Sequence, residues 1–347
     1  MAASDTLARA LERGADCTAA DSFYRIAWSP CGRFIACGDD TPGNAAHARV
    51  WHAGSGREAY SIANDAVGDA RGLVYANAVG FAGDRLVVVT SDACFVHDAA
   101  TGARVKRVPL VGLPGLPSAM VARASVSPLG LVALGYDDGA VRVLDIDTER
   151  LSAPMDAART HVLATALSFD GTKVAAVTHH GECRMSNESA LVVWDARTSR
   201  VLAPCTLAPV DHDCIMAWAN RSDAIALVVN NRLTVVRLGD EGIRSSSTLE
   251  FGCQQPVAVA WSPDDATIAC IILNDIVFVR ADDLAAPPVR TIAMQEAAGE
   301  AGDGACIVFA PLAFDANRAT IATLEYWIAD PTDPVAEAPY HPVIRSL

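Results

Sequence analysis

The chain has 347 residues and a formal net charge of −14, with 27 Lys and Arg against 41 Asp and Glu. Binding to nucleic-acid phosphates or to an anionic membrane surface depends on basic residues, so the overall charge argues against both. The longest apolar stretches, such as residues 268–273, have the length of a strand and are too short to span a membrane.

The chain contains ten cysteines but no C-x-x-C pair, and no basic segment followed by an apolar run opens it. A secretory signal would have that second pattern. Free cysteines within strand patterns are typical of a reducing compartment. The sequence therefore predicts a cytoplasmic protein, and we expect it to be monomeric by itself and to need no cofactor.

The first 21 residues precede the repeating part of the chain. Residues 6–13 have a helical composition, and the Gly-Ala-Asp that follows at 14–16 is a plausible helix stop. We expect a short helical segment at 1–21 that covers one end of a single domain spanning 22–347.

From residue 26 onward, one pattern recurs: an alternating apolar run, a tight turn of the Ser-Pro or Asp-Gly kind, and a returning apolar run. Each copy has the signature of a β-hairpin. The copies lie at residues 26–38, 76–90, 122–135, 163–177, 214–228, 257–271 and, most degraded, 305–324. Their aligned apolar anchors are Trp28, Phe81, Val126, Leu167, Trp218, Trp261 and Leu312.

The anchors are separated by 41 to 53 residues, which is the period of propeller blades. Seven copies predict an all-β fold, a seven-bladed β-propeller of four-stranded antiparallel blades. The three tryptophans occupy equivalent positions just before the turn, where packing between adjacent blades is their expected role.

After each hairpin comes a polar turn and a third short strand, at residues 48–56, 94–102, 140–148, 190–198, 233–242 and 275–283. Trp194-Asp195 closes one of these strands, and Trp51-His52, His97-Asp98 and Leu144-Asp145 keep one letter of that pair. In this respect residues 22–330 resemble the WD-repeat β-propellers, whose third strand ends in Trp-Asp. The Gly-His dipeptide that usually opens such a repeat is missing.

The WD-repeat resemblance implies two further things. An Asp at the turn between the second and third strands would knit its blade together through hydrogen bonds, a role for which Asp138 matches best, ahead of Asp92 and Asp275. It also implies an interaction scaffold without catalytic activity.

Insertions between the strands are candidate functional loops. A Pro- and Gly-rich loop occupies 103–121, a longer turn occupies 179–189, and an acidic run of small residues occupies 296–304. The sequence offers two ways in which the ring of blades could close. Either residues 326–329 and 342–347 supply the last two strands, or residues 17–22 supply the outer one.

Metal chemistry has one candidate, the His179-His180-x-x-Cys183 motif, which Cys205, His212 or Cys214 could complete. A structural zinc site needs four ligands and only three are local, so a solvated loop is the alternative that we prefer. No phosphate-binding, metalloprotease or serine-hydrolase motif occurs in the chain.

Two functional interpretations remain. The first is a non-enzymatic scaffold that binds a protein or peptide on one propeller face. The second is a cytosolic propeller enzyme of the lactonase type, which would need His, Arg and Glu side chains converging on the central channel. The absence of a catalytic motif favours the first interpretation.

For a scaffold, the sequence singles out the turns between second and third strands, which should emerge together on one face. Acidic and amide residues dominate these turns, which predicts a basic peptide or protein segment as the partner. The candidate partner-binding residues are Asp39, Asp40, Tyr136, Asp137, His179, His180, Asn230, Asn231, Asn274, Asp275 and Glu325.

Overall fold

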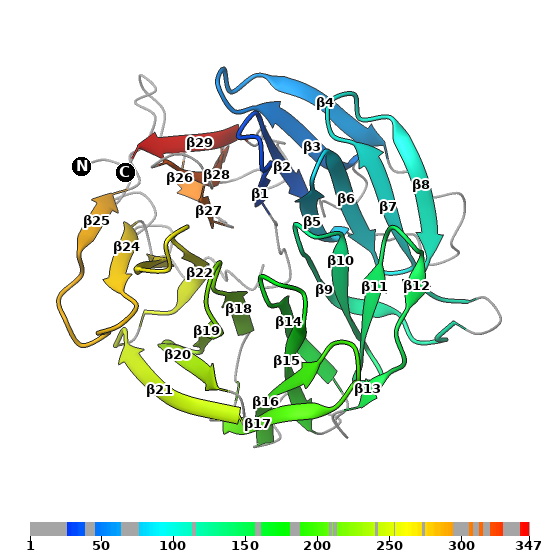
Figure 1. Cartoon of the computed structure of the whole chain (residues 1–347). Helices are drawn as coiled ribbons and strands as arrows, with labels where there is room; N and C mark the ends of the chain where they lie inside the picture. The colour runs from blue at the N-terminus through cyan, green and yellow to red at the C-terminus, as the bar shows by residue number, and fades with distance from the viewer. Residues whose placement is uncertain are drawn as a thin grey trace.

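The computed structural model arranges antiparallel sheets side by side around a central axis, with the first strand of each sheet innermost (Figure 1). The residues that it describes are 26–38, 46–63, 76–112, 116–156, 161–180, 188–207, 210, 214–239, 242–252, 254–272, 275–293, 305–307, 312–314, 320–328 and 341–346. This arrangement is a β-propeller.

Six blades are four strands wide and follow one another along the chain. Blade one consists of β1 (Ile26–Trp28), β2 (Phe34–Gly38), β3 (Ala46–His52) and β4 (Glu58–Ala63). Blade two consists of β5 (Ala76–Ala82), β6 (Arg85–Thr90), β7 (Ala93–Asp98) and β8 (Arg104–Pro109). Blade three consists of β9 (Val121–Val126), β10 (Leu131–Tyr136), β11 (Ala140–Asp145) and an outer strand split into β12 (Arg150–Leu151) and β13 (Met155–Asp156).

The next three blades are built in the same way. Blade four consists of β14 (His161–Leu167), β15 (Lys173–His180), β16 (Glu188–Asp195) and β17 (Val201–Leu207). Blade five consists of β18 (Cys214–Trp218), β19 (Ala224–Val229), β20 (Arg232–Gly239) and β21 (Gly242–Glu250). Blade six consists of β22 (Pro256–Trp261), β23 (Thr267–Ile272), β24 (Asp275–Arg280) and β25 (Arg290–Ala293).

The last sheet, between blades six and one, is built differently. Its strands are β26 (Ala305–Ile307), β27 (Leu312–Phe314), β28 (Thr320–Ile328) and β29 (His341–Ser346). β27 and β29 flank β28, whereas β26 pairs only with residues 326–328 at the far end of β28. Within the described residues, β28 is the only strand of this sheet that pairs with the other three, so its four strands do not follow one another side by side as in the other blades.

The predicted count of seven blades is therefore wrong. Six four-stranded blades are present, and the described residues contain no helix. The count failed at residues 305–324, where the hairpin pattern is most degraded and the described residues before β28 form two short strands, β26 and β27. The expected helix at 1–21 and the alternative strand at 17–22 lie outside the described residues. Within the described part of the chain, no helix is long and apolar enough to cross a membrane.

The six regular hairpins confirm the repeating pattern, and their turns show how it works. Ser262 Oγ donates to Asp264 Oδ1 at 2.6 Å and accepts from the backbone N–H of Thr267 at 3.0 Å. Ser168 makes the same pair of bonds with Asp170 and Lys173. One hydroxyl thus closes the turn between the first and second strands, which explains why Ser-x-Asp recurs there.

A second device closes the turn between the third and fourth strands. Asp195 Oδ1 accepts from the backbone N–H of Arg197 and from both the N–H and the hydroxyl of Thr198. Asp98 does the same with Ala100 and Thr101. The bonds from Thr198 lower the pKa of Asp195 below its ordinary value.

These bonds predict an acid-sensitive contribution to stability. Because its folded-state pKa lies below 3.8, ionised Asp195 stabilises the fold above that ordinary value, and the contribution disappears as the pH falls through the folded-state pKa. Urea unfolding measured from pH 7 down to pH 3 should show a smaller acid-induced loss in Asp195→Asn than in the unchanged chain. Identical pH dependence in the two proteins would contradict this assignment.

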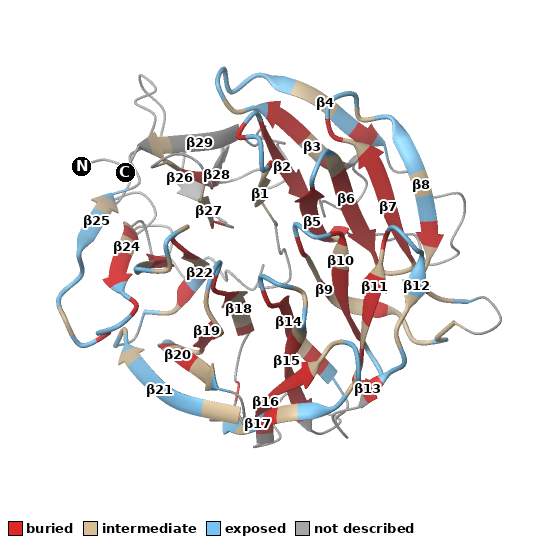
Figure 2. Ribbon diagram, viewed as in Figure 1, coloured by how far each residue is buried: buried red, intermediate tan, exposed pale blue. Residues whose placement is uncertain are grey.

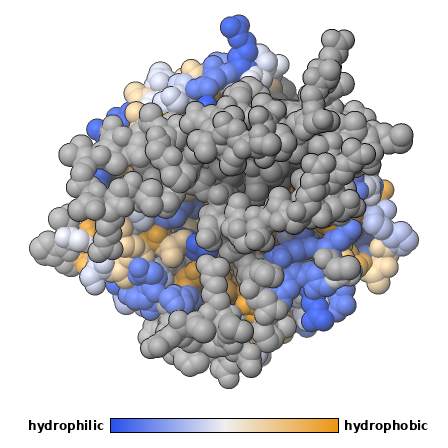
Figure 3. All heavy atoms as spheres, turned by 180° about the vertical axis from the view of Figure 1, so that it is seen from behind, coloured by the Kyte–Doolittle hydropathy of each residue, from blue (hydrophilic) through white to orange (hydrophobic). Residues whose placement is uncertain are grey.

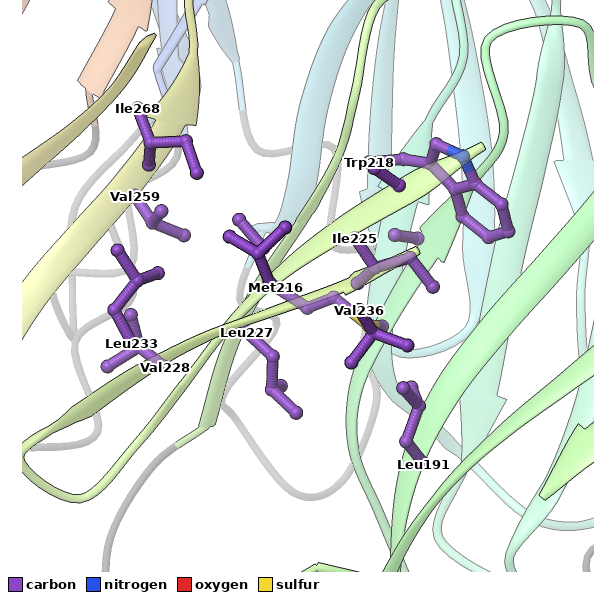
Figure 4. Close-up of a cluster of buried hydrophobic side chains, with 14 of the residues drawn as sticks. Leu191, Met216, Trp218, Ile225, Leu227, Val228, Leu233, Val236, Val259 and Ile268 are labelled. Atoms are coloured by element: carbon purple, nitrogen blue, oxygen red, sulfur yellow. The ribbon is translucent and has the colours of Figure 1, made fainter. Parts of the chain in front are cut away.

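Burial follows the order of the strands. The second strands are almost wholly buried, whereas outer strands such as β4, β8, β21 and β25 are largely exposed (Figure 2). The largest apolar cluster joins blades four, five and six through residues such as Leu191, Met216, Trp218, Ile225 and Ile268 (Figure 4). Adjacent blades therefore share their cores instead of packing one core each.

Candidate protein-binding face

The turns between second and third strands lie on one face because every blade repeats the same antiparallel order. Three such turns fall within the described residues, at 91–92, 137–139 and 230–231. Of the predicted partner-binding residues, Asp39, Asp40 and Asn274 lie outside the described part of the chain.

The connection between blades two and three crosses this face and is tied to both neighbouring turns. The backbone N–H of Leu110 donates to the Asp92 carbonyl at 2.8 Å, and that of Val121 donates to the Ser91 carbonyl at 2.9 Å. Asp137 and Met120 bond reciprocally: the Asp137 N–H donates to the Met120 carbonyl at 3.0 Å, and the Met120 N–H donates to Asp137 Oδ1 at 3.2 Å. The described residues of this connection and two of the predicted turns therefore form one surface. The Pro- and Gly-rich loop expected at 103–121 is shorter than predicted, because residues 104–109 form β8.

The negative charge of Asp92 is paired with a positive charge within this surface. It accepts from the Thr90 hydroxyl at 2.7 Å and forms an ion pair of 3.0 Å with Arg107 of the outer strand β8. The Arg107 guanidinium also lies 5.6 Å from the centre of the Phe95 ring, within range of a cation–π contact. Asp92 is thus part of the blade's own bonding and offers little unpaired charge to a partner.

Asp138 contributes less to the hydrogen bonding of its turn than the WD-repeat resemblance implied. Its carboxylate accepts from the backbone N–H of Ala140 at 3.0 Å, two residues along the chain. Asp92, which was expected to be the weaker match, makes bonds to the strand residue Thr90 and to Arg107. Asp137 and Asp138 are both exposed, and they form the most prominent acidic turn among the described residues of this face.

Two predicted contact residues are buried. Tyr136 has no exposed surface, and its hydroxyl donates to the Leu110 carbonyl at 3.4 Å. Burial raises the pKa of Tyr136 well above its usual value. His179 is 3 % exposed and bonds through Nδ1 to the Ser189 hydroxyl at 3.1 Å. Both side chains belong to the interior and are not available to a partner.

The remaining predicted residues are distributed around the ring. Asn230 and Asn231 form the turn of blade five, where Asn230 has a φ of 53° and the Asn231 side chain donates to the Gly252 carbonyl. Asp275 begins β24 and is half-buried. The backbones of His180 and Glu325 lie in β15 and β28, but their side chains are not described. Figure 3 shows hydrophilic and apolar side chains interspersed on the side opposite to the view of Figure 1.

Sequence reasoning missed Arg107 and Met120 on this face. Arg107 comes from an outer strand, 15 residues away from Asp92, and nothing local to either residue indicates their contact. The basic run Arg-Val-Lys-Arg at 104–107 was the available signal, because a basic outer strand can reach an acidic turn of its own blade.

The metal candidate receives no support from the geometry. His179 is buried and its Nδ1 bonds to the Ser189 hydroxyl, whereas the side chain of His180 is not described. Cys183 and His212 lie outside the described residues. Within the described part of the chain, no group of three or more His, Cys, Asp or Glu side chains is arranged to hold a metal ion.

Comparison with known proteins adds information about the fold alone. No family model matches the chain, and no curated protein matches it by sequence. Among solved structures, it is similar to a chain of hydrazine synthase from Kuenenia stuttgartiensis, with a TM-score of 0.65, 11% identity, and coverage of 89% of this chain and 96% of that one. It is also similar to the Cps50 (Swd1) β-propeller domain from Myceliophteria thermophila, with a TM-score of 0.63, 12% identity, and coverage of 93% and 96%.

Proposed function

We propose that this β-propeller is a non-enzymatic scaffold that binds a basic peptide or protein segment at the acidic turn Asp137–Asp138. The observation that carries the proposal is the reciprocal bonding of Asp137 to Met120, which fixes the exposed Asp137 carboxylate beside the connection between blades two and three, with the exposed Asp138 next to it. A fixed acidic surface loses little conformational entropy when it binds and attracts a basic partner. Hydrolysis of a sugar lactone by the purified protein would contradict a scaffold without catalytic activity.

We also propose that the blades are degenerate WD repeats. Asp98, Asp145 and Asp195 all end a third strand, and each accepts backbone N–H groups from the turn that follows. The shared turn supports a common repeat even where the Trp of the Trp-Asp pair has been lost. The structural similarity to the Cps50 (Swd1) β-propeller domain is compatible with this proposal.

Replacing Asp138 by Lys should slow the association of a basic partner. We would measure association rates for short Lys- and Arg-rich peptides, with Asp- and Glu-rich peptides of equal length as a reference, at low and physiological salt. Charges at the edge of an interface act mainly on the association rate and are screened by salt. We expect Asp138→Lys to slow association by about threefold to tenfold at low salt and to weaken its salt dependence.

Asp84→Lys is the matched control. Asp84 is also an exposed acidic turn residue, but its turn joins first and second strands and therefore lies on the opposite face. The two variants have the same net charge, so a general attraction between this acidic chain and any basic peptide would affect both equally. Equal association rates for the two variants would refute the proposed binding face.

A further inference from the structure

The outer strand of blade five, β21, has the longest exposed edge among the described outer strands. It spans nine residues, from Gly242 to Glu250, contains no Pro, and has Arg244 as its one cationic side chain. Edge strands are normally protected by Pro, by cationic side chains or by being short, since an unpaired edge invites another strand. Most other outer strands follow that rule: β8, β17 and β29 contain Pro, β25 has four residues, and β12 and β13 have two each. β4 has neither Pro nor a cationic side chain, but it is three residues shorter than β21.

The side chains of β21 leave this edge open. Residues 244–248 are all exposed, and four of these five are Ser or Thr, which are small enough to allow another backbone to approach. The strand lies on the periphery of the ring, with β20 on its inner side (Figure 1). Its edge is therefore accessible along most of its length.

The pairing with β20 determines which backbone groups point outward. The Phe251 N–H donates to the Asn231 carbonyl at 2.9 Å, and Glu250 pairs with Arg232 in the adjoining register position. In an antiparallel ladder, hydrogen-bonded pairs alternate with non-bonded ones. Leu249 and Ser247 therefore bond to β20, whereas the N–H and C=O groups of Glu250, Thr248 and Ser246 point away from the blade.

The charges of β21 are self-complementary. A two-fold axis through Ser247 places Ser246 opposite Thr248 of a second copy, so that their outward backbone groups can exchange hydrogen bonds. The same axis brings Arg244, the extra residue of a β-bulge against β20, level with Glu250 of the second copy on both sides of the interface. Moving the axis by one residue in either direction loses both charge pairs.

Both charged side chains can take part in such pairs. Arg244 and Glu250 are exposed, and Arg244 has no ion pair within the described part of the chain. Glu250 accepts from Arg232 at 2.8 Å within its own blade. A carboxylate has about four lone-pair sites, so Glu250 can accept from a second guanidinium as well.

We infer that two copies of this chain associate through antiparallel pairing of β21 with β21, centred on Ser247. The two blades then form one continuous eight-stranded sheet across the two-fold axis. This differs from the monomer expected from the sequence. It is independent of the acidic turn, so Asp138→Lys should leave the dimer intact.

Charge reversal tests the register. Sedimentation velocity over a range of protein concentrations should show a monomer–dimer equilibrium for the unchanged chain. Arg244→Glu and Glu250→Arg should each weaken dimerisation by roughly tenfold, because each replaces two attractive pairs by two repulsive ones. An equimolar mixture of the two variants should dimerise again, since the two introduced charges have opposite signs and face each other in the mixed dimer. Arg150→Glu, on the outer strand of blade three, is the matched control and should have no effect.

A backbone variant tests the edge itself. Ser246→Pro removes an N–H that points away from the blade, so the β20–β21 ladder keeps its bonds while the dimer loses two. We expect unchanged thermal unfolding of the monomer and a loss of dimer. A chain that stays monomeric up to several hundred micromolar would overturn the inference, as would a dimer that survives Ser246→Pro and both charge reversals.

Discussion

Replacing Trp261 by Ala should lower the free energy of unfolding by about 3–5 kcal/mol, through lost burial and the cavity left between blades five and six. Trp261 is 4 % exposed and belongs to the cluster shared by blades four to six. Its Nε1 donates to the Ala217 carbonyl of the preceding blade at 3.0 Å. Since whole domains are stable by only about 5–15 kcal/mol, thermal unfolding should shift by several degrees or soluble expression should fail.

Trp261→Phe separates the two contributions. Phe keeps most of the apolar volume but cannot donate to the Ala217 carbonyl, so it should lose only the contribution of one hydrogen bond, about 0.5–1.5 kcal/mol. Denaturant unfolding of both variants measures the difference. An unchanged midpoint for Trp261→Ala would show that the indole does not pack between the blades.

The hairpins and their order could be predicted from the sequence because their signals are local. Ser262 closes its turn with partners two and five residues away, and Asp195 with partners two and three residues away. A bond of such short range leaves its pattern within a single repeat. Where the pattern is degraded, at residues 305–324, the count of blades also failed.

The candidate face could be predicted only in part, because its bonds join distant segments. The position of Asp137 in a turn correctly predicted that this residue is exposed. It could not show that Tyr136 points into the core or that His179 faces Ser189, since strand residues alternate between faces and a shift of one residue reverses the outcome. The contact between Arg107 and Asp92 depends on how β8 packs at the edge of its blade, for which the sequence has no local signal.

Gly135→Ala should lower the free energy of unfolding by about 1–3 kcal/mol, the usual effect of adding volume to a packed core. Gly135 lies in β10 of blade three and faces β14 of blade four. A Cβ at this position would clash with Val162 Cγ1 and lie 3.2 Å from Thr165 Cγ2, so the two blades would have to move apart. Glycine is thus required here by the close approach of two sheets. Denaturant unfolding at neutral pH measures the loss.

Two further variants distinguish this clash from a general effect of removing glycine. Gly54→Ala is the matched control, because no heavy atom lies within 4 Å of a Cβ there, and it should leave stability within about 0.5 kcal/mol. Val162→Ala removes the atom nearest to the new methyl group. Adding Val162→Ala to Gly135→Ala should therefore cost at least about 0.5 kcal/mol less than the sum of the single changes. Strict additivity of the two changes would show that blades three and four do not pack against each other at Gly135.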